Sequence, residues 1–260
     1  EPQDPQFGPL PGNPGNREGV RVGTRQEINL PLQLGPVDVT PYASGDVTYW
    51  GEDLNGDEVT RLLGQLGIRT STSMWTADPT VCLPLLNVNG LAHKVTFETE
   101  LLYADADKNL SALPLYDNLD DNVTEDFRHF FLFTTFPFPG PIPPMFDSRF
   151  YALRTGMQSD VTAHSLEMAD DRTVLNLGVR QRWQTKRGLP GRERIVDWIT
   201  FDVGGSVFPD EDDNFGEHVG LVNYNFRWLV GDRFAVLSDG FYDFFTDGLR
   251  MTNVGATVTT

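Results

Sequence analysis

The sequence has very little cysteine, no long apolar runs and too little positive charge, and each shortage excludes a class of protein. Cys82 is the only cysteine, so the chain cannot form an internal disulfide. No apolar run approaches the roughly 18 residues that mark a transmembrane helix, so we expect none. The chain has 20 Lys and Arg against 37 Asp and Glu, a formal net charge of -17. Because no basic excess is present to neutralise phosphates, we expect no nucleic-acid partner.

Aromatic side chains are plentiful: the sequence contains 18 Phe, 7 Tyr and 5 Trp. Hydrophobic residues, with glycine not counted, make up 39% of the chain. This combination is typical of alternating strands that present one face to an apolar environment.

Residues 174–188, VLNLGVRQRWQTKRG, show such an alternation most clearly. One set of alternate positions is apolar: Leu175, Leu177, Val179 and Trp183. The other set is polar and strongly cationic: Asn176, Arg180, Arg182, Gln184 and Lys186. This period of two predicts a strand with one apolar and one wet face. Similar patterns predict strands at 20–34, 37–50, 66–76, 91–103, 127–136, 148–157, around 161–167, and at 194–208, 221–229, 233–239 and within 241–259.

The predicted organisation is an all-β, antiparallel up-and-down meander of roughly nine to twelve strands. A Pro/Gly-rich linker or loop at residues 1–18 precedes it. Short turns at 35–36 and 231–232 alternate with long polar loops at 51–58, 104–126 and 209–219, and another loop is expected at 77–90. Most predicted strands have about 9–14 residues, whereas strands in globular proteins average about five or six. Long alternating strands of this kind are typical of an outer-membrane β-barrel.

In that interpretation the apolar positions face lipid and the charged positions face a watery lumen. Aromatic residues near the strand ends are then candidates for the two interfacial girdles: Tyr49, Trp50, Trp75, Tyr103, Trp183 and Trp228. A soluble antiparallel sandwich with polar outer faces remains an open alternative, because the dyad pattern is weak in any single segment.

Motifs for catalysis or cofactor binding are missing from the sequence. The nearest text to a nucleophile elbow, residues 204–208, lacks the last glycine and lies in a predicted strand. The acidic runs that begin at Asp105 and Asp210 start like calcium-binding loops but lack the central glycine and the final glutamate. We therefore expect a non-enzymatic protein without a cofactor or metal site. Weak divalent binding by surface carboxylates is the alternative.

Three stretches carry more than a strand pattern: GIRTSTSMW (67–75), NVNGLAHKVTFETELLYADAD (87–107) and LGVRQRWQTKRGLPGRERIVDWITFDVGGSVFPDEDDNFG (177–216). The third combines RxRxQTKRG, a short loop, (I/V)DW and a strand that ends in an FP-acidic-N motif. Together they resemble the LPS-assembly protein LptD family, also called organic solvent tolerance protein OstA, in its divergent planctomycete-like version. The resemblance implies a large outer-membrane barrel of about 26 strands, of which residues 19–260 form an internal segment. The family's periplasmic jelly-roll domain and paired cysteines are not evident here.

The family inserts lipopolysaccharide (LPS) into the outer leaflet without covalent chemistry. The resemblance therefore implies location in the cell outer membrane. It implies as partners LPS or a related glycolipid, outer-membrane lipid, an LptE-like lipoprotein and the periplasmic LPS-transport bridge. The candidates for contact with LPS phosphates form a lumen-facing cationic patch: Arg180, Arg182 and Lys186.

Two alternatives stay open. The arginines of this patch pair instead with lumen carboxylates, such as Glu98, Glu100 or Asp202, and hold the wall rigid. Alternatively, the chain belongs to a different outer-membrane barrel, a porin-like pore or a scaffold, that shares only the strand pattern.

Overall fold

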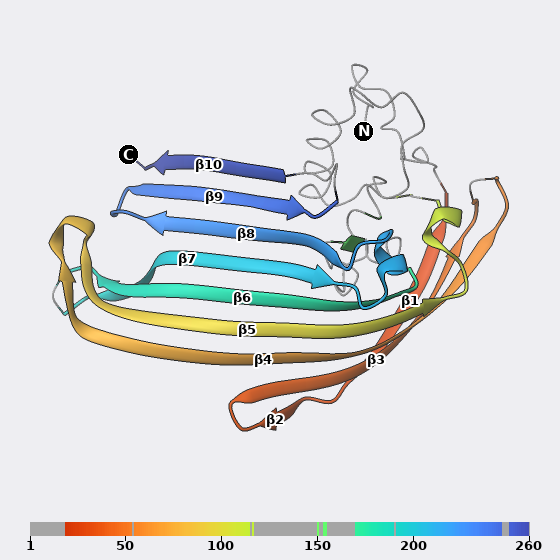
Figure 1. Ribbon diagram of the computed structural model, residues 1–260, viewed down its shortest axis with the longest axis horizontal. Helices are drawn as coiled ribbons and strands as arrows, with labels where there is room; N and C mark the ends of the chain where they lie inside the picture. The colour runs from red at the N-terminus through yellow and green to blue at the C-terminus, as the bar shows by residue number, and fades with distance from the viewer. Residues whose placement is uncertain are drawn as a thin grey trace, which may run out of the picture.

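The computed structural model describes residues 19–53, 55–114, 116, 150, 153–154, 170–189, 191–245 and 250–259. These residues form one 10-stranded sheet in the order β1-β3-β4-β5-β6-β7-β8-β9-β10 (Figure 1). β2 pairs with β3 and continues the edge that β1 forms. All pairs are antiparallel and follow the chain order, so the predicted all-β meander is confirmed. The described strands form an open sheet, which is not closed into a barrel.

The strands are long, as the alternation predicts. They are β1 (Arg21–Asn29), β2 (Leu32–Leu34), β3 (Val37–Trp50), β4 (Val59–Leu83), β5 (Val88–Ala106), β6 (Arg172–Arg187), β7 (Arg194–Val207), β8 (Val219–Leu229), β9 (Phe234–Asp243) and β10 (Arg250–Val258). Three short 3-10 turns are described between strands: η1 (Pro84–Leu86), η2 (Leu110–Ala112) and η6 (Glu211–Asn214).

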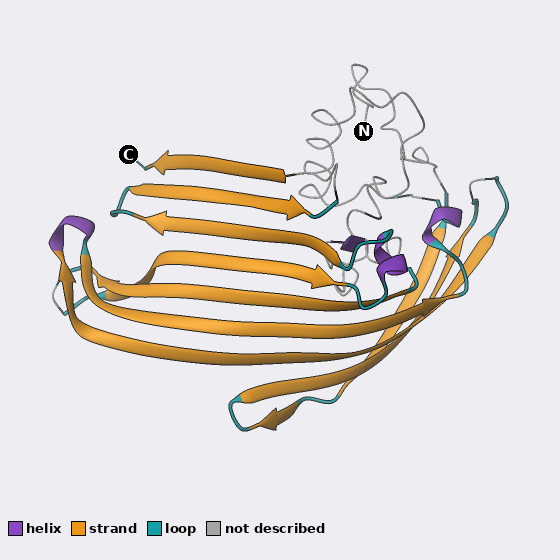
Figure 2. Ribbon diagram, in the orientation of Figure 1, coloured by secondary structure: helices purple, strands orange, loops and turns teal. Residues whose placement is uncertain are grey.

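The connections differ between the two ends of the sheet. The turn end holds the connections at residues 35–36, 84–87, 188–193 and 230–233. The loop end holds those at residues 51–58, 107–171, 208–218 and 244–249. Figure 2 shows that η1 lies at the turn end, and η2 and η6 at the loop end. At the turn end Gly35 has a φ of 63°, a left-handed conformation that glycine adopts without strain. The predicted turns at 35–36 and 231–232 and the predicted loops at 51–58 and 209–219 are therefore confirmed, whereas most of the predicted loop at 104–126 lies outside the described residues.

The predicted loop at 77–90 is wrong. β4 continues to Leu83 and β5 begins at Val88, so only residues 84–87 connect them. The sequence suggests a loop because Asp78 and Pro79 interrupt the alternation, and proline removes a ladder donor. The structure accommodates them by a register shift between Asp78 and Cys82, after which pairing with β5 resumes. A bulge therefore replaces the expected loop.

The predicted strand at 148–157 is also not what the structure shows. The described residues of that range, Phe150, Leu153 and Arg154, are helical. Leu153 and Arg154 are fully buried. The predicted linker at 1–18 and the predicted strands at 127–136 and 161–167 lie outside the described residues.

A second bulge explains an irregular position in β7. Asp197 falls among apolar residues in the alternation of 194–208. In the structure the register shifts there, so that Trp183 faces Ile199 while Gln184 faces Asp197. Trp198 is the extra residue, and the bulge moves Asp197 to the polar side of the sheet, where Gln184 donates a hydrogen bond of 2.8 Å to it.

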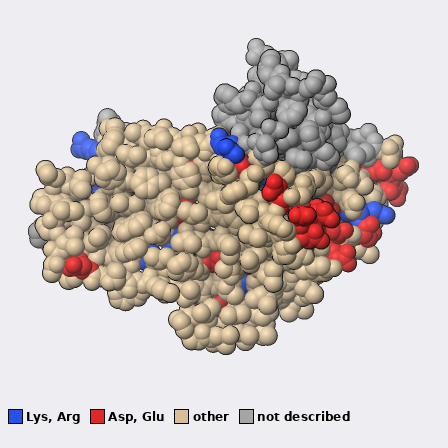
Figure 3. All heavy atoms as spheres, viewed as in Figure 1, with Lys and Arg blue, Asp and Glu red and all other residues tan. Residues whose placement is uncertain are grey.

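The register sorts side chains onto two faces, because directly opposed residues of an antiparallel pair share a face. The polar face carries Glu27, Arg69, Glu100, Arg180, Asp202 and Asn223, among others. The apolar face carries Ile28, Leu66, Phe97, Leu101, Leu177 and Val254, whose exposed fractions are 78, 59, 40, 46, 43 and 76%. Figure 3 shows one face with a surface over the central strands almost free of charged groups, and with acidic side chains gathered near η6. Apolar side chains thus lie open across the sheet.

Candidate functional site on the polar face

A groove of about 450 Å³ lies on the polar face, in the middle of the strands. Side chains of both charge signs line it together with amides, hydroxyls and glycines: Asp38, Thr40, Arg69, Ser71, Glu98, Glu100, Asn176, Gly178, Arg180, Gly204 and Asn223. They come from β3 to β8, so the groove crosses the sheet. An arrangement of this kind can hold a polar ligand by hydrogen bonds and charge.

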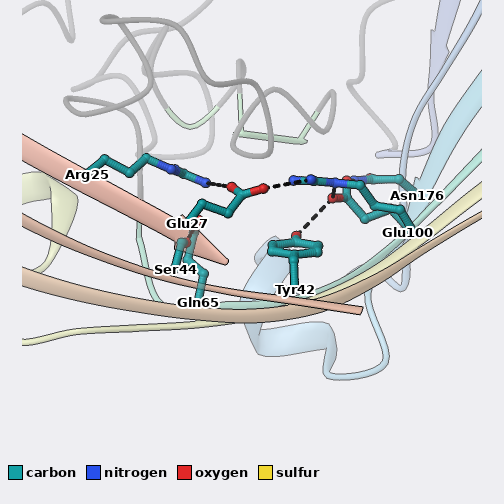
Figure 4. A network of polar contacts seen from close by, with 8 residues as sticks. Arg25, Glu27, Tyr42, Ser44, Gln65, Glu100 and Asn176 are labelled. Atoms are coloured by element: carbon teal, nitrogen blue, oxygen red, sulfur yellow. Dashed lines mark hydrogen bonds and ion pairs between the residues drawn. The ribbon is translucent and has the colours of Figure 1, made fainter. Parts of the chain in front are cut away.

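A chain of charged side chains runs across the polar face from β1 to β5 and reaches the groove through Arg69 and Glu100 (Figure 4). Glu27 accepts hydrogen bonds from Arg25 (3.1 Å) and from Arg69 (2.9 Å). Arg69 also donates from Nε to Glu100 Oε1 at 2.8 Å, and the Tyr42 hydroxyl donates to the same oxygen at 2.8 Å. Arg69 thus bridges carboxylates on two strands that are not neighbours of each other, β1 and β5, and holds the sheet's polar side in a fixed arrangement.

Gly67 makes the position of the Tyr42 ring possible. The two residues face each other across β3 and β4, and a Cβ at Gly67 would lie only 2.5 Å from the ring. The ring occupies this space, and the guanidinium of Arg69 stacks over it at 3.8 Å from the centroid. A side chain at position 67 would therefore displace both the ring and the arginine.

Glycines also form the floor on the other side of the groove. Gly178 and Gly204 face each other across β6 and β7, beside Glu98 and Asn223. A Cβ at Gly204 would come within 2.9 Å of the Asn223 side-chain oxygen. The absence of side chains at these positions keeps the middle of the polar face low and opens the groove to its full width.

The structure places the three predicted site residues on one face, but it does not bring them into one cluster. Arg180 lines the groove and forms an ion pair with Glu98 at 2.9 Å. Arg182 holds Asp202 through two hydrogen bonds, of which the Nη2–Oδ2 bond is 2.8 Å. Lys186 is exposed close to the turn end, outside the groove, and has no ion pair with any described residue. Two of the three carboxylates proposed as counter-charges are thus in place, whereas Glu100 binds Arg69 instead.

Near the loop end the polar face is dry. The guanidinium of Arg154 forms an ion pair with Asp243, and both side chains are 1% exposed. Its Nε also donates to Asn214 at 2.8 Å, and it lies 4.4 Å from the centroid of the Phe245 ring. The Ser206 hydroxyl donates to the Arg154 backbone carbonyl at 2.6 Å. Arg154 therefore anchors a piece of the β5–β6 connection against β7 and β9.

Arg187 organises the turn end. It is 6% exposed and donates to the backbone carbonyls of Asn87, Gly231 and Leu229, at 3.2, 2.7 and 2.8 Å. It also lies 3.5 Å from Asp232. The Asn87 side chain donates to the same aspartate at 3.0 Å. A single buried guanidinium thus ties the β4–β5 turn to the β8–β9 turn, and its role is structural.

Two aspartates outside the strands have shifted pKa values of opposite sign. Burial raises the pKa of Asp170, although the Leu110 backbone N–H donates to it at 3.2 Å. The pKa of Asp53 is lowered, because the backbone N–H groups of Asp57 and Asn55 donate to its carboxylate at 3.0 and 2.7 Å. The folded state thus favours the ionised form of Asp53 and disfavours the ionised form of Asp170.

The acidic runs considered for calcium serve as loop supports. Asp107 accepts the backbone N–H of Leu62 at 2.7 Å, and Asp210 accepts that of Asp212 at 3.1 Å. Within the described residues, no three His, Cys, Asp or Glu side chains are arranged to hold a metal ion. No helix in the described part of the chain is both long and apolar enough to cross a membrane.

The candidate girdle residues divide between the two faces. Tyr49 and Tyr103 lie on the apolar face towards the loop end, whereas Trp183 and Trp228 lie on it towards the turn end. Trp50 and Trp75 lie on the polar face, so they cannot belong to a girdle on the apolar side. Trp50 is fully buried and Trp75 is 75% exposed. Nearness to a strand end suggested all six, but parity decides which of them face outward.

His93 joins the aromatic group at the turn end. Its ring stacks on Trp183 with 4.5 Å between centroids and an interplanar angle of 5°, and its Nε2 lies 3.2 Å from the Gln181 side-chain oxygen. The stacked ring and its polar contact within the sheet give this histidine a structural role.

Sequence reasoning did not find the Glu27–Arg69–Glu100–Tyr42 network or the Arg154 anchor. The polar parity of Glu27, Arg69 and Glu100 was a usable signal, but their pairing depends on a register that the sequence does not state. No protein-family model matches this chain, and no curated protein is significantly similar to it.

Proposed function

We propose that residues 19–260 belong to the wall of an outer-membrane β-barrel which, like the LptD family it resembles, inserts LPS or a related glycolipid into the outer leaflet without covalent chemistry. The observation that carries this proposal is the unpartnered apolar face. Its large side chains are exposed from Ile28 in β1 to Val254 in β10. Soluble monomers rarely expose contiguous apolar patches of more than a few hundred Å². A bilayer is the occupant that covers a whole sheet face along the strands.

The aromatic residues of the apolar face support a lipid boundary at both ends. On β5, His93 lies in the aromatic group at the turn end and Tyr103 lies in the aromatic group at the loop end. They lie roughly 33 Å apart at about 3.3 Å per residue. At a strand tilt of about 40° this distance spans roughly 25 Å, the height of the apolar band in outer-membrane barrels. The separation of the two aromatic groups, measured across the proposed membrane, thus equals the height of apolar surface that faces lipid in such barrels.

The polar face supports a wet interior. Arg180 and Glu98 remain 59 and 38% exposed as they pair, and Arg182 and Asp202 remain 27 and 35% exposed. Charges at such depth along a membrane-spanning strand are tolerated on a lumen face, whereas on a lipid face they cost roughly 2–4 kcal/mol each for Arg or Lys. The ten strands then form part of a wall that further strands complete.

A soluble sandwich needs a second sheet over the apolar face. All the described strands belong to a single sheet, and they leave that face open. The two interpretations differ in what covers Leu177, which lies in the middle of β6 on the apolar face. They agree that Asn223, in β8 on the polar face, is wet.

The test places a fluorophore at each of these positions. In a Cys82→Ser background, Leu177→Cys and Asn223→Cys are each labelled with an environment-sensitive NBD group, and the chain is refolded into phosphatidylcholine vesicles. We expect blue-shifted emission that nitroxide-bearing lipids quench at position 177, and water-like, unquenched emission at position 223. Equal emission at the two sites, or cooperative monomeric folding in buffer without detergent, contradicts the proposal.

A passive pore is the second candidate, and the paired arginines favour it. Ion pairs that are already satisfied suit a fixed, rigid wall as well as a transient contact with phosphates. Arg180→Gln and Arg182→Gln separate the two, each tested for folding by heat-modifiable gel migration and for binding of purified LPS. Normal folding with weaker LPS binding supports glycolipid handling. Normal folding with unchanged binding, or loss of the folded state, supports a structural wall.

A further inference from the structure

A row of side chains crosses the polar face close to the turn end, and it is separate from the groove. The register aligns Trp75 of β4 with Lys94 of β5, Lys94 with Arg182 of β6, Arg182 with Thr200 of β7, and Thr200 with Arg227 of β8. We call these residues the cationic row: Trp75, Lys94, Arg182, Thr200 and Arg227. None of them except Arg182 is paired with a carboxylate among the described residues.

Two carboxylates around the row are held in ion pairs, Asp202 by Arg182 and Glu98 by Arg180. Asp197 and Asp239 keep their charge, because they accept hydrogen bonds only from the neutral amides of Gln184 (2.8 Å) and Asn253 (3.0 Å). Lys94 and Arg227 are exposed, and neither forms an ion pair with a described residue. Two exposed cations whose ammonium and guanidinium groups hold no carboxylate can each contact an external anion.

Trp75 adds an aromatic surface at one end of the row. Its side chain is 75% exposed although it lies on the polar face, next to Lys94. A large aromatic ring left open on a wet surface is typical of a binding position, because it offers a flat apolar contact to a ligand that also has polar groups. Sugar rings have one such apolar face together with hydroxyls for Thr200.

The row also sets the length of the ligand. Lys94 and Arg227 lie three strands apart, which is roughly 14 Å at about 4.8 Å per strand. A single small anion cannot contact both cations and the tryptophan. A short chain of sugar rings that bears negative groups spans the distance.

We propose that the cationic row binds an anionic oligosaccharide, with Lys94 and Arg227 contacting its phosphate or carboxylate groups and Trp75 stacking on one of its rings. The inference rests on the proposed function only in taking the polar face to be open to water. It assigns the ligand contacts to the unpaired cations, in contrast to the cationic patch suggested by the strand pattern.

The test measures binding to the full chain in detergent micelles by isothermal titration calorimetry. Trigalacturonate is the anionic probe, maltotriose is the neutral probe of equal ring number, and inorganic pyrophosphate is the anion without a ring. We expect trigalacturonate to bind most tightly, with an affinity that falls as salt is added. Lys94→Gln and Arg227→Gln should each weaken it about tenfold, the loss of one charge-assisted contact.

Two further variants keep the test specific. Lys108→Gln removes an exposed cation at the loop end and should leave trigalacturonate affinity unchanged. Trp75→Leu should weaken trigalacturonate binding but leave pyrophosphate binding unchanged. No binding of trigalacturonate, equal binding of maltotriose, or an equal loss in Lys108→Gln overturns the inference. The probes are soluble, so a negative binding result does not bear on the assignment of the apolar face to lipid. Conversely, failure of the NBD experiment alone does not bear on the oligosaccharide site.

Discussion

The two faces of the sheet are built from alternate residues of the same strands, yet they are stabilised in opposite ways. On the apolar face the side chains of Phe97 and Leu101 are 40 and 46% exposed and have little to pack against. On the polar face Arg69 holds Glu27 and Glu100 at 2.9 and 2.8 Å. The polar face thus provides its own partners, whereas the apolar face depends on a surrounding medium. Exposure on one face means contact with lipid in our proposal, and on the other contact with water.

The polar face is itself not uniform. In its centre, Arg180 and Glu98 remain substantially exposed in their pair. At the loop end, Arg154 and Asp243 are almost completely buried. Water screens the first pair and not the second, so the same chemical interaction should differ several-fold in its contribution to stability.

The largest effect is expected where the polar face is dry. Arg154→Met leaves Asp243 as a buried charge without its partner, which should lower the free energy of unfolding by about 3–5 kcal/mol. Arg180→Met, the same substitution in an exposed ion pair, should lower the free energy of unfolding by about 1 kcal/mol or less. Urea titrations of both variants in the same vesicles provide the measurement. Equal losses contradict the contrast between the two regions. The double variant Arg154→Met/Asp243→Leu should recover much of the loss, since it removes both charges.

The next effect tests the apolar face. Phe97→Arg puts a charge in the middle of the proposed lipid-facing surface and should destabilise the membrane-folded state by about 2–4 kcal/mol. Asn225→Arg is the matched control on the polar face. It lies next to Tyr224, which the register places in the row of Phe97. The folded fraction in vesicles, read from heat-modifiable migration across a urea series, should fall for position 97 alone. If position 225 is equally sensitive, the assignment of the faces is wrong.

Alternation predicted the two faces correctly, because it depends only on the period of the strand. Arg180 and Arg182 lie on the polar face as expected, and Glu98 and Asp202 balance them. The partners of Arg69 were not predictable from the sequence. Which residues of β1 and β5 lie beside it depends on the pairing registers of β1 with β3, of β3 with β4 and of β4 with β5. The alternation was also misread around Pro79 and Asp197, where the strands contain bulges. A bulge of one residue changes parity or hides a strand, and it leaves little trace in the sequence.

The Arg154 anchor was missed for a different reason. Its neighbours alternate like a strand, whereas Phe150, Leu153 and Arg154 are helical in the structure. Burial of Arg154 depends on Asp243, Asn214 and Ser206, which come from three separate parts of the chain. Long-range contacts of this kind override a local period that a short segment only weakly expresses.

A smaller effect compares one tyrosine on each face. Tyr42→Phe removes the hydrogen bond of 2.8 Å to Glu100, and should cost about 1 kcal/mol. Tyr103 lies on the apolar face and is 52% exposed, and its hydroxyl has no partner among the described residues, so Tyr103→Phe should change stability by only a few tenths of that. Paired urea titrations in the same vesicles decide between them. A larger loss for Tyr103→Phe would show that the interfacial hydroxyl matters more than the network.

The smallest effect concerns the loop end and depends on pH. The folded-state pKa of Asp170 is raised, so its favourable contribution is present below the unfolded pKa of about 3.9 and is lost as pH rises through the folded value. Asp170→Asn keeps an oxygen for the Leu110 N–H, so it should be at least as stable as the native chain at pH 7 and lose that advantage at pH 4. The pKa of Asp53 is lowered, so Asp53→Asn should lose stability at pH 7 and approach the native chain as pH falls. Urea unfolding at both pH values measures the stability of each variant relative to the native chain. If this relative stability changes in the same direction with pH for both variants, the opposite pKa shifts of the two carboxylates are wrong.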